Sequence, residues 1–197
     1  MNDMVKMVVV LTVLSSVAGG VLAAVNKGTA SQIEAQQLTF VKGPAIKAIL
    51  AGSSIDPIEN RFKIIDGDVE KSFFVGKFDG QANTIAFEEF GKGFGGDIGV
   101  MVGINIDSDK LVGAAVTVHT ETPGMGARAK DDPGFVSQFI DLPVTDAVSV
   151  TKDGGQINAI SGATITSRAV CDAVGKALNS YKKMKSQLHE EIQKVGK

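Results

Sequence analysis

The sequence predicts an α+β protein, in which a transmembrane helix precedes a largely antiparallel sheet with flanking helices. Three observations predict this class: an uncharged apolar run near the first residue, several short strand-like runs separated by turn residues, and a long amphipathic segment near the last residue. The 197 residues suit a membrane anchor followed by one water-facing domain. The net charge of −2, the single tyrosine and the absence of tryptophan argue against a nucleic-acid partner.

The first element is the apolar run, residues 7–25, which contains no charged residue and is close to the length of a membrane-spanning helix. Lys6 and Lys27 bracket it, so both ammonium groups can reach an interface. A cleaved signal peptide is the alternative, because Val21-Leu22-Ala23 resembles a cleavage site. We favour an anchor because the run is longer than a usual signal core. The flanking lysines barely discriminate between the two orientations.

Residues 29–50 can form a second helical stretch, which Gly43-Pro44 would break or kink. Its candidate buried positions are Ile33, Leu38, Ile46 and Ile49. Five strand-like runs follow: residues 62–65, 73–78, 84–90, 98–106 and 111–119. The turns expected between them are Asp66-Gly67-Asp68, Asp79-Gly80 and Asp107-Ser108-Asp109-Lys110.

The remaining elements are shorter, apart from the last one. Residues 133–140 are a helix candidate, and residues 148–151 and 156–160 are strand candidates. A long helix should begin at Ser167, with a buried face formed by Val170, Val174, Ala177, Leu178 and Tyr181. The charged residues 182–197 should project into solvent, fray or meet a partner.

The chain has too few metal-binding side chains to hold a redox-active metal centre. Cys171 is the only cysteine, whereas an iron–sulfur cluster needs several thiolates. The two histidines, His119 and His189, are far apart and have no zinc-type spacing. If the chain carries electrons, it therefore needs an organic cofactor.

Chemistry is concentrated in residues 158–170, which run from a predicted strand into the last helix. Ser161-Gly162-Ala163-Thr164 is a tight link of small residues, which lets a bulky group approach the backbone. Thr166 and Ser167 are N-cap residue types, and the free amides of a helix start favour a phosphate. The alternative is a capped helix without a ligand.

Two motifs in this chain resemble those of the FMN-binding domain family. SGATITS at residues 161–167 resembles its flavinylation motif, although Asn158 stands where an acidic residue is usual, three positions before the serine. HTETPGMG at residues 119–126 resembles its HxETPGLG segment, with Met125 in place of leucine. The glycine-rich residues 91–104 are also similar to the family. The resemblance covers most of residues 91–174, in order, and the N-terminal anchor.

The resemblance implies flavin mononucleotide (FMN) held covalently through a phosphoester on Thr164. A separate flavin transferase would pass FMN from flavin adenine dinucleotide to this hydroxyl. The implied binding residues are Ser161, Gly162, Ala163, Thr164, Thr166, Ser167, Glu121, Thr122, Pro123, Gly124, Met125 and Gly126. The implied divisions are residues 1–27 as the anchor, 28–90 as an N-terminal α/β portion, and 91–197 as the FMN-binding domain with its charged helix.

Some side chains near these motifs keep two interpretations. Met125 would contact the flavin ring or fill a gap in the loop. Lys152 would pair with the phosphate or lie in solvent. His119 is more consistent with a structural role than with proton donation. Glu121 would anchor its loop, and Cys171 would be a packed small residue.

The family includes the G subunit of the Rnf electron-transport complex and the C subunit of the sodium-pumping NADH:quinone reductase. The short length and the anchor match the G subunit better. This implies an electron relay in a cell (inner) membrane complex that couples ferredoxin/NAD electron transfer to ion translocation. The soluble domain would face outside the cytoplasm, beside other membrane, flavin and iron–sulfur subunits. The alternatives are a C-type subunit, a non-redox membrane-anchored binding module and a free-standing FMN-dependent reductase.

Overall fold

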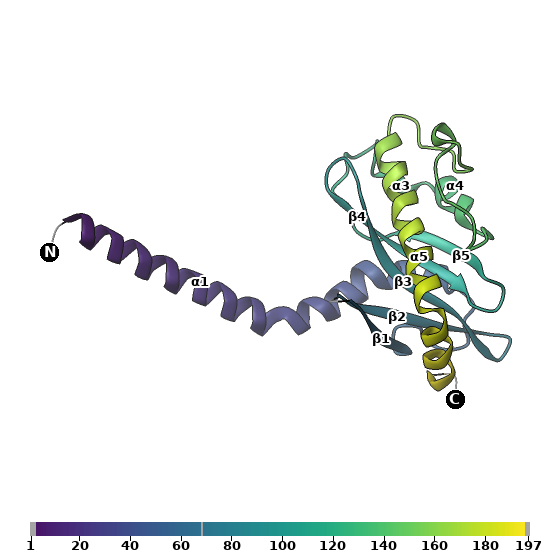
Figure 1. Cartoon of the computed structure of the whole chain (residues 1–197), viewed down its shortest axis with the longest axis horizontal. Coiled ribbons are helices and arrows are strands. Elements are labelled where there is room, and N and C mark those ends of the chain that lie inside the picture. Colours follow the sequence, from purple (N-terminus) through teal and green to yellow (C-terminus); the bar gives the residue numbers. More distant parts are fainter. Residues whose placement is uncertain (1–2, 68, 196–197) are drawn as a thin grey trace. The chain divides into compact units, whose positions relative to one another are not determined.

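The structure is a computed structural model that describes residues 3–67 and 69–195 (Figure 1). The chain divides into two units, residues 1–40 and residues 41–197. The second unit holds the sheet and every residue expected at the site.

The first unit is almost entirely the helix α1 (Asp3–Gln36), which has no buried residue. It is long and apolar enough to cross a membrane, as expected. A π-helix, η1 (Gln37–Lys42), follows it and leads to α2 (Gly43–Ile49). Pro44 lies in the first turn of α2, where its missing N–H is not needed, so the expected break at Gly43-Pro44 is instead a change of helix type.

Only part of the buried face expected for this stretch is present. Ile46 and Ile49 are buried on α2, whereas Ile33 is 46 % exposed and Leu38 is half-buried. The expectation for Ile33 was wrong, since α1 has no buried residue.

The five expected strands form one antiparallel sheet in the order β1-β2-β3-β4-β5. Their bounds are β1 (Arg61–Asp66), β2 (Val69–Phe78), β3 (Gln81–Lys92), β4 (Asp97–Asn105) and β5 (Lys110–Val116). Each strand pairs with the next one in the sequence, so every connection is a hairpin. The boundary expected between residues 90 and 91 falls within β3, and the sheet runs across it.

Turn chemistry fixes the hairpins, as predicted. Asp79 and Gly80 both have positive φ angles, 53° and 81°, which is the geometry that a two-residue hairpin turn requires. Asp109 has a φ of 53° in the β4–β5 turn, and the Asn105 side chain accepts the amide hydrogens of Asp107 and Ser108. The third turn contains Gly67, with a φ of 67°, and Asp68, which lies outside the described residues.

The two faces of the sheet carry different side chains because neighbouring residues of a strand point in opposite directions. Phe74, Ala86 and Gly103 pair across β2, β3 and β4 and form one row. A Cβ atom on Gly103 would lie 2.3 Å from Ile49 Cγ2, so this row faces α2. The small residues in this row therefore let α2 lie close to the sheet.

The opposite face is covered by α5 (Thr164–Val195), which packs mainly on β3 and β4 (Figure 1). The buried face of α5 includes the predicted residues and continues through Met184, Leu188 and Ile192. These apolar residues recur every four positions, so most of the charged segment remains packed instead of projecting into solvent. The helix also begins at Thr164, three residues earlier than expected.

Between β5 and α5 the two strand predictions were wrong, and the predicted helix is present in two pieces. Residues 148–151 and 156–160 are not strands: a single parallel bridge joins Val150 to Ile157, and a 3₁₀ turn, η3 (Thr151–Asp153), follows Val150. The predicted helix at residues 133–140 is split into α4 (Pro133–Val136) and a 3₁₀ turn, η2 (Ser137–Phe139), after a short helix α3 (Arg128–Asp131). The Asp132 side chain accepts the Gly134 N–H and caps α4.

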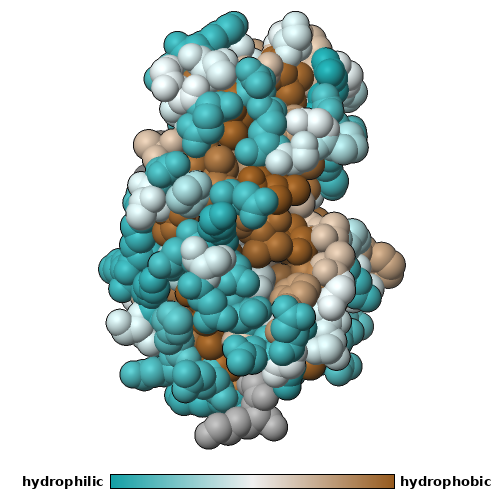
Figure 2. All heavy atoms as spheres, turned by 90° about the vertical axis from the view of Figure 1, so that its right-hand side faces the viewer, coloured by the Kyte–Doolittle hydropathy of each residue, from teal (hydrophilic) through white to brown (hydrophobic). Residues whose placement is uncertain are grey.

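Apolar surface also reaches the outside of this unit. Figure 2 shows one face of the molecule, on which hydrophobic residues gather in the middle between hydrophilic regions. The large exposed apolar side chains of residues 61–195 include Ile65, Val69, Phe90, Phe94, Val118, Met125, Ile140 and Ile165. Three of them, Phe94, Met125 and Ile165, line a single cavity.

The contact of β3 with α5 leads to a testable prediction. A Cβ atom on Gly91 would lie 1.9 Å from the Ala169 carbonyl oxygen, and neither backbone can move freely. Gly91→Ala should therefore lower the free energy of unfolding by about 1 to 3 kcal/mol. Tyr181 is the only tyrosine, is buried, and has no tryptophan beside it, so its fluorescence in a urea titration reports unfolding of this unit.

Gly175→Ala, on the same helix, is the matched control. Nothing lies within 4 Å of a Cβ atom at Gly175, so alanine there should raise the stability by about 0.5 to 1 kcal/mol. Equal effects of the two substitutions would show that the β3–α5 contact is looser than described.

Candidate cofactor site

A cavity of about 460 Å³ lies at the start of α5. This volume is within the range of about 300 to 1,000 Å³ that is usual for small-molecule sites. The cavity is lined by Phe94, Glu121, Thr122, Met125, Gly126, Lys152, Gly162, Ala163, Thr164, Ile165 and Thr166. The structure therefore brings the 119–126 segment and the 161–167 segment to one cavity.

The floor of the cavity is the link between residue 160 and α5. Gly162 adopts a left-handed conformation with a φ of 80°, and the Ala163 N–H donates to the Ile160 carbonyl at 3.0 Å. The Ser167 N–H donates to the Ala163 carbonyl at 3.0 Å and begins the hydrogen-bond ladder of the helix. Thr164 is thus the first residue of α5, and its half-buried side chain lines the cavity.

Thr166 and Ser167 are not N-cap residues, because α5 begins before them and both are buried. The Ser167 hydroxyl accepts the Ile160 N–H at 3.0 Å and donates to the Ala163 carbonyl at 2.9 Å. The Thr166 hydroxyl donates to the Glu121 carboxylate. These two side chains therefore fasten the first turn of α5 to the segments around it.

The wall opposite the link is the ETPGMG loop. Gly124 has a φ of 74°, and the amides of Met125 and Ala127 both donate to the Thr122 carbonyl at 3.2 Å, so the loop closes on itself. Met125 is 50 % exposed, and its Cε atom would lie 3.5 Å from a Cβ atom on Gly162. The side chain of Met125 therefore reaches the link across the cavity.

Glu121 joins three segments around the cavity. Its side chain is only 7 % exposed. One carboxylate oxygen accepts the Gly95 N–H at 2.8 Å, and the other accepts the Thr166 hydroxyl. A Cβ atom on Gly126 would lie 2.5 Å from the same carboxylate, so only glycine fits beside it. The structural role expected for Glu121 is confirmed.

The environment of Glu121 keeps its side chain ionised. Burial acts to raise the pKa of this carboxyl group. The hydrogen bonds from the Thr166 hydroxyl and from the amides of Gly95 and Phe94, together with the nearby His119, outweigh burial and hold the pKa below its ordinary value. The charge is therefore part of the folded structure at neutral pH.

The third wall is the glycine-rich connection between β3 and β4. The Gly93 N–H donates to the Gly96 carbonyl at 2.8 Å, and the Thr120 hydroxyl donates to the Gly95 carbonyl at 2.8 Å. This packing leaves Phe94 74 % exposed at the edge of the cavity. Phe94 and Ile165 were missed from the sequence, although each is a large apolar residue within a motif of small or polar residues.

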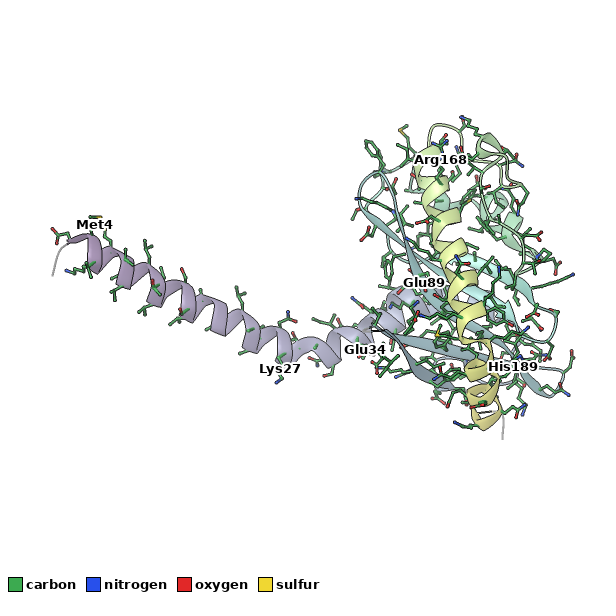
Figure 3. The ribbon with its side chains drawn as sticks, viewed as in Figure 1. Met4, Lys27, Glu34, Glu89, Arg168 and His189 are labelled. Atoms are coloured by element: carbon green, nitrogen blue, oxygen red, sulfur yellow. The ribbon has the colours of Figure 1, made fainter. Side chains whose placement is uncertain are left out.

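A basic side chain lies beside Thr164. The Lys152 Nζ atom is 3.5 Å from Thr164 Oγ1. Its neighbour Asp153 binds Arg168 in a bidentate pair, with both N–O distances at 2.7 Å. Figure 3 shows Arg168 near the end of α5 at which the helix begins, and His189 near the other end. The structure thus places Lys152 beside Thr164, the residue expected to carry the phosphate.

Four of the predicted residues do not line the cavity. Ser161, Pro123 and Gly124 are exposed in the two motifs, and Ser167 is buried behind the link. Asn158 is exposed as well. Its backbone N–H donates to the Gln138 side-chain oxygen at 2.7 Å, and its carbonyl accepts the Gln138 side-chain N–H at 3.3 Å. The fold therefore holds Asn158 by its backbone.

The remaining polar candidates have structural roles. The His119 Nδ1 atom accepts the Glu121 N–H at 3.3 Å, which agrees with the structural interpretation. Cys171 is buried, and burial raises the pKa of its thiol to about 12, so the thiol stays protonated and packed. Within residues 3–67 and 69–195, no group of three or more His, Cys, Asp or Glu side chains could hold a metal ion.

The cavity combines apolar walls with a hydroxyl, an ammonium and a helix start. Phe94, Met125 and Ile165 suit a flat aromatic ligand, and Thr164 and Lys152 suit an anionic tail. The fold and the site define a flavin mononucleotide-binding domain, and the profile of the family described as "FMN-binding domain" matches residues 93–179.

Relatives of known name extend this match to almost the whole chain. The G subunit of the ion-translocating oxidoreductase complex of Methanosarcina acetivorans is 37 % identical over 181 residues, which are 90 % of this chain and 94 % of that one. The G subunit of the complex of the same name from Pseudomonas aeruginosa is 30 % identical over 194 residues, or 91 % and 89 % of the two chains. The chain therefore belongs to the family of G subunits of ion-translocating oxidoreductase complexes.

Solved structures support the same fold. The C subunit of the Na⁺-translocating NADH-quinone reductase from Parabacteroides distasonis has a TM-score of 0.53 and 25 % identity, over 62 % of this chain and 75 % of that one. That C subunit thus shares the fold of the matched part of this chain.

Glu121 gives a prediction with a defined pH dependence. Glu121→Gln removes the charge that the Thr166 hydroxyl and the Gly95 amide bind, so the free energy of unfolding at pH 7 should fall by about 1.5 to 3 kcal/mol. The folded pKa is depressed, so this stability is present above the unfolded pKa and is lost as the pH falls through the folded value. The difference between wild type and variant should therefore shrink on acidification.

The measurement is urea unfolding of both proteins at neutral and acidic pH, followed by Tyr181 fluorescence. The exposed Glu190, replaced by glutamine on the outer side of α5, is the control for a lost surface charge and should change little at either pH. A constant difference for Glu121→Gln across the pH range would contradict the assignment.

Proposed function

We propose that this chain is the FMN-bearing subunit of an ion-translocating oxidoreductase complex and relays electrons within it. The observation that carries the proposal is the single cavity on which the ETPGMG and SGAT segments converge, in a chain 37 % identical to a G subunit over nearly its full length. No substrate turnover by the isolated chain is expected, because a relay exchanges electrons only with its partners.

The residues at the cavity fit FMN on three counts. Gly162 is exposed, and the Met125 Cε atom, 3.5 Å from where a Cβ atom would lie, is the side-chain atom nearest to it, so the backbone of the link is open to close approach by a ligand. The exposed apolar side chains at the rim offer contacts for a flavin ring. The start of α5 offers its amides and the positive end of its dipole to a phosphate.

The attachment we propose is a phosphoester between FMN and the Thr164 hydroxyl. This oxygen lines the cavity at the first residue of α5 and is half-buried, so it is accessible from the cavity. A threonine hydroxyl is a weak nucleophile without activation, and its neighbour Lys152 is no base when protonated. A flavin transferase acting in trans is therefore part of the proposal.

The protein binds and orients the cofactor in this scheme, and bound FMN supplies the reversible uptake of electrons. Met125 and Phe94 would contact the ring, and the ETPGMG backbone would bind its polar edge. Glu121 would position the cofactor indirectly, because it holds the three walls of the cavity together. The pocket is open at its rim, which leaves the ring edge within reach of a partner.

The anchor and the family support a location in the membrane. We propose that α1 crosses the cell (inner) membrane once and that residues 41–197 lie on the extracytoplasmic side. The partners would be other membrane, flavin and iron–sulfur subunits of one complex, which couples ferredoxin/NAD electron transfer to ion translocation. The apolar length of α1 and the names of the relatives support this arrangement.

A C-type subunit of a sodium-pumping NADH:quinone reductase is the second candidate, and the fold likeness to the solved C subunit favours it. We prefer the G subunit because the identity is higher and the coverage of both chains is greater. The cavity weighs against a binding module without a redox role, since a plain helix cap needs no second motif opposite it.

Replacing the attachment residue tests the proposal. Thr164→Val keeps the shape of the side chain and removes the oxygen, so it should abolish flavin fluorescence that survives denaturing electrophoresis. The full chain should be expressed with a flavin transferase. Intact mass should show FMN added to the wild type and an unmodified variant.

Thr145→Val is the matched control, because Thr145 is exposed and lies outside the cavity. This variant should keep full fluorescence and the added mass. Fluorescence that persists in Thr164→Val would place the attachment elsewhere, and an unmodified wild type would overturn the proposal.

A further inference from the structure

The surroundings of Thr164 contain a lysine for which no ion pair is found among the described residues. Lys152 lies on the 3₁₀ turn η3, and its ammonium is 3.5 Å from Thr164 Oγ1. Among the described residues, no carboxylate lies within ion-pair distance of Lys152, whereas several lysines that flank the sheet or α5 do have one, such as Lys71, Lys183 and Lys185. The cavity therefore holds a lysine ammonium beside the hydroxyl that is not engaged in an ion pair.

The backbone around Lys152 is fixed on both sides. Val150 and Ile157 are fully buried and form the parallel bridge, and the Thr151 N–H donates to the Ile157 carbonyl at 2.8 Å. Gly154 ends the turn in a left-handed conformation with a φ of 84°. A Cβ atom on Gly155 would lie 2.1 Å from the Ser149 carbonyl oxygen, so the chain doubles back tightly. The turn thus has little freedom to carry Lys152 away from Thr164.

The ion pair between Asp153 and Arg168 ties this turn directly to α5. Arg168 lies one helical turn after Thr164, so the pair sets η3 against the first turn of the helix. The hydrogen bonds from Arg168 hold the pKa of Asp153 below its ordinary value. Burial opposes them, and the charges of Arg168 and Lys152 lower the pKa further. Asp153 therefore accepts its hydrogen bonds from Arg168, and it acts on Lys152 only through its charge.

We propose that Lys152 is the counter-cation of the phosphoryl group carried by Thr164 and accelerates its transfer to that residue. This inference rests on the proposed attachment of FMN. A phosphodiester keeps one negative charge, and a lysine ammonium is a compact charge whose rotatable donors suit phosphate oxygens. Attachment would convert an unpaired cation at the cavity into a neutral ion pair.

In the transfer, the Thr164 oxygen forms a bond to the flavin-side phosphorus of flavin adenine dinucleotide. The phosphoanhydride bond breaks, adenosine monophosphate leaves with the bridging oxygen, and the hydroxyl proton passes to a base of the transferase. The incoming donor is anionic, so an ammonium 3.5 Å from the acceptor oxygen attracts it toward that oxygen. Lys152 thereby favours transfer to Thr164.

The test compares Lys152→Gln, which removes the charge, with Lys152→Arg, which keeps it. The full chain is expressed with a flavin transferase, and intact mass follows the modified fraction over time. Loading of Lys152→Gln should be about fivefold slower than that of the wild type, and Lys152→Arg should recover most of the rate. Phosphorus-31 NMR of the loaded proteins should show a shifted phosphodiester signal in the glutamine variant.

Lys182→Gln is the matched control. Lys182 is exposed on the same helix as Thr164, roughly 27 Å further along the helix axis. It should load at the wild-type rate with an unchanged phosphorus signal. Lys152→Gln that behaves like this control would overturn the inference while loaded wild type upholds the attachment. A wild type that is never loaded would overturn both.

Discussion

The site depends on one buried carboxylate. Glu121 accepts hydrogen bonds from the β3–β4 connection and from the first turn of α5, and it leaves room at Gly126 only for a hydrogen atom. These three segments are distant in the sequence, and each contributes a wall of the cavity. Because a buried charge must keep all its donors, the walls cannot move apart independently. The cavity is therefore as rigid as the sheet and helix that support it.

The sheet could be predicted because its signals are local. Alternating strands and paired Asp and Gly turns, such as Asp79-Gly80, specify consecutive hairpins without reference to the rest of the chain. The structure of residues 148–160 could not be predicted from the sequence. Individual apolar residues such as Val150 and Ile157 are buried there, but they pair in one bridge only and form no strand. The extent of α5 was similarly hidden, since Met184, Leu188 and Ile192 lie among many charged residues.

The site could be predicted largely through the two motifs, whose residues the structure brings to one cavity. Composition alone gave a weak signal there, because a small-residue link before a helix is common. Phe94 and Ile165 were missed because their exposure at the cavity depends on how the glycine loop folds against Thr120 and Glu121. The N-cap role expected for Thr166 and Ser167 failed because the helix begins earlier, at Thr164, and their hydroxyls serve tertiary contacts instead.

The exposed rim of the cavity has a consequence for how a cofactor stays bound. Side chains that are half to three-quarters exposed, such as Met125 and Phe94, cannot desolvate a ligand enough to hold it by burial alone. A tether at Thr164 would replace affinity with a high effective concentration, so the ring could remain at the cavity while its outer edge stays in contact with water. In an enclosed pocket, holding the cofactor and exposing it to a partner compete. Here the bond at Thr164 would hold the cofactor, and the open rim would expose the ring.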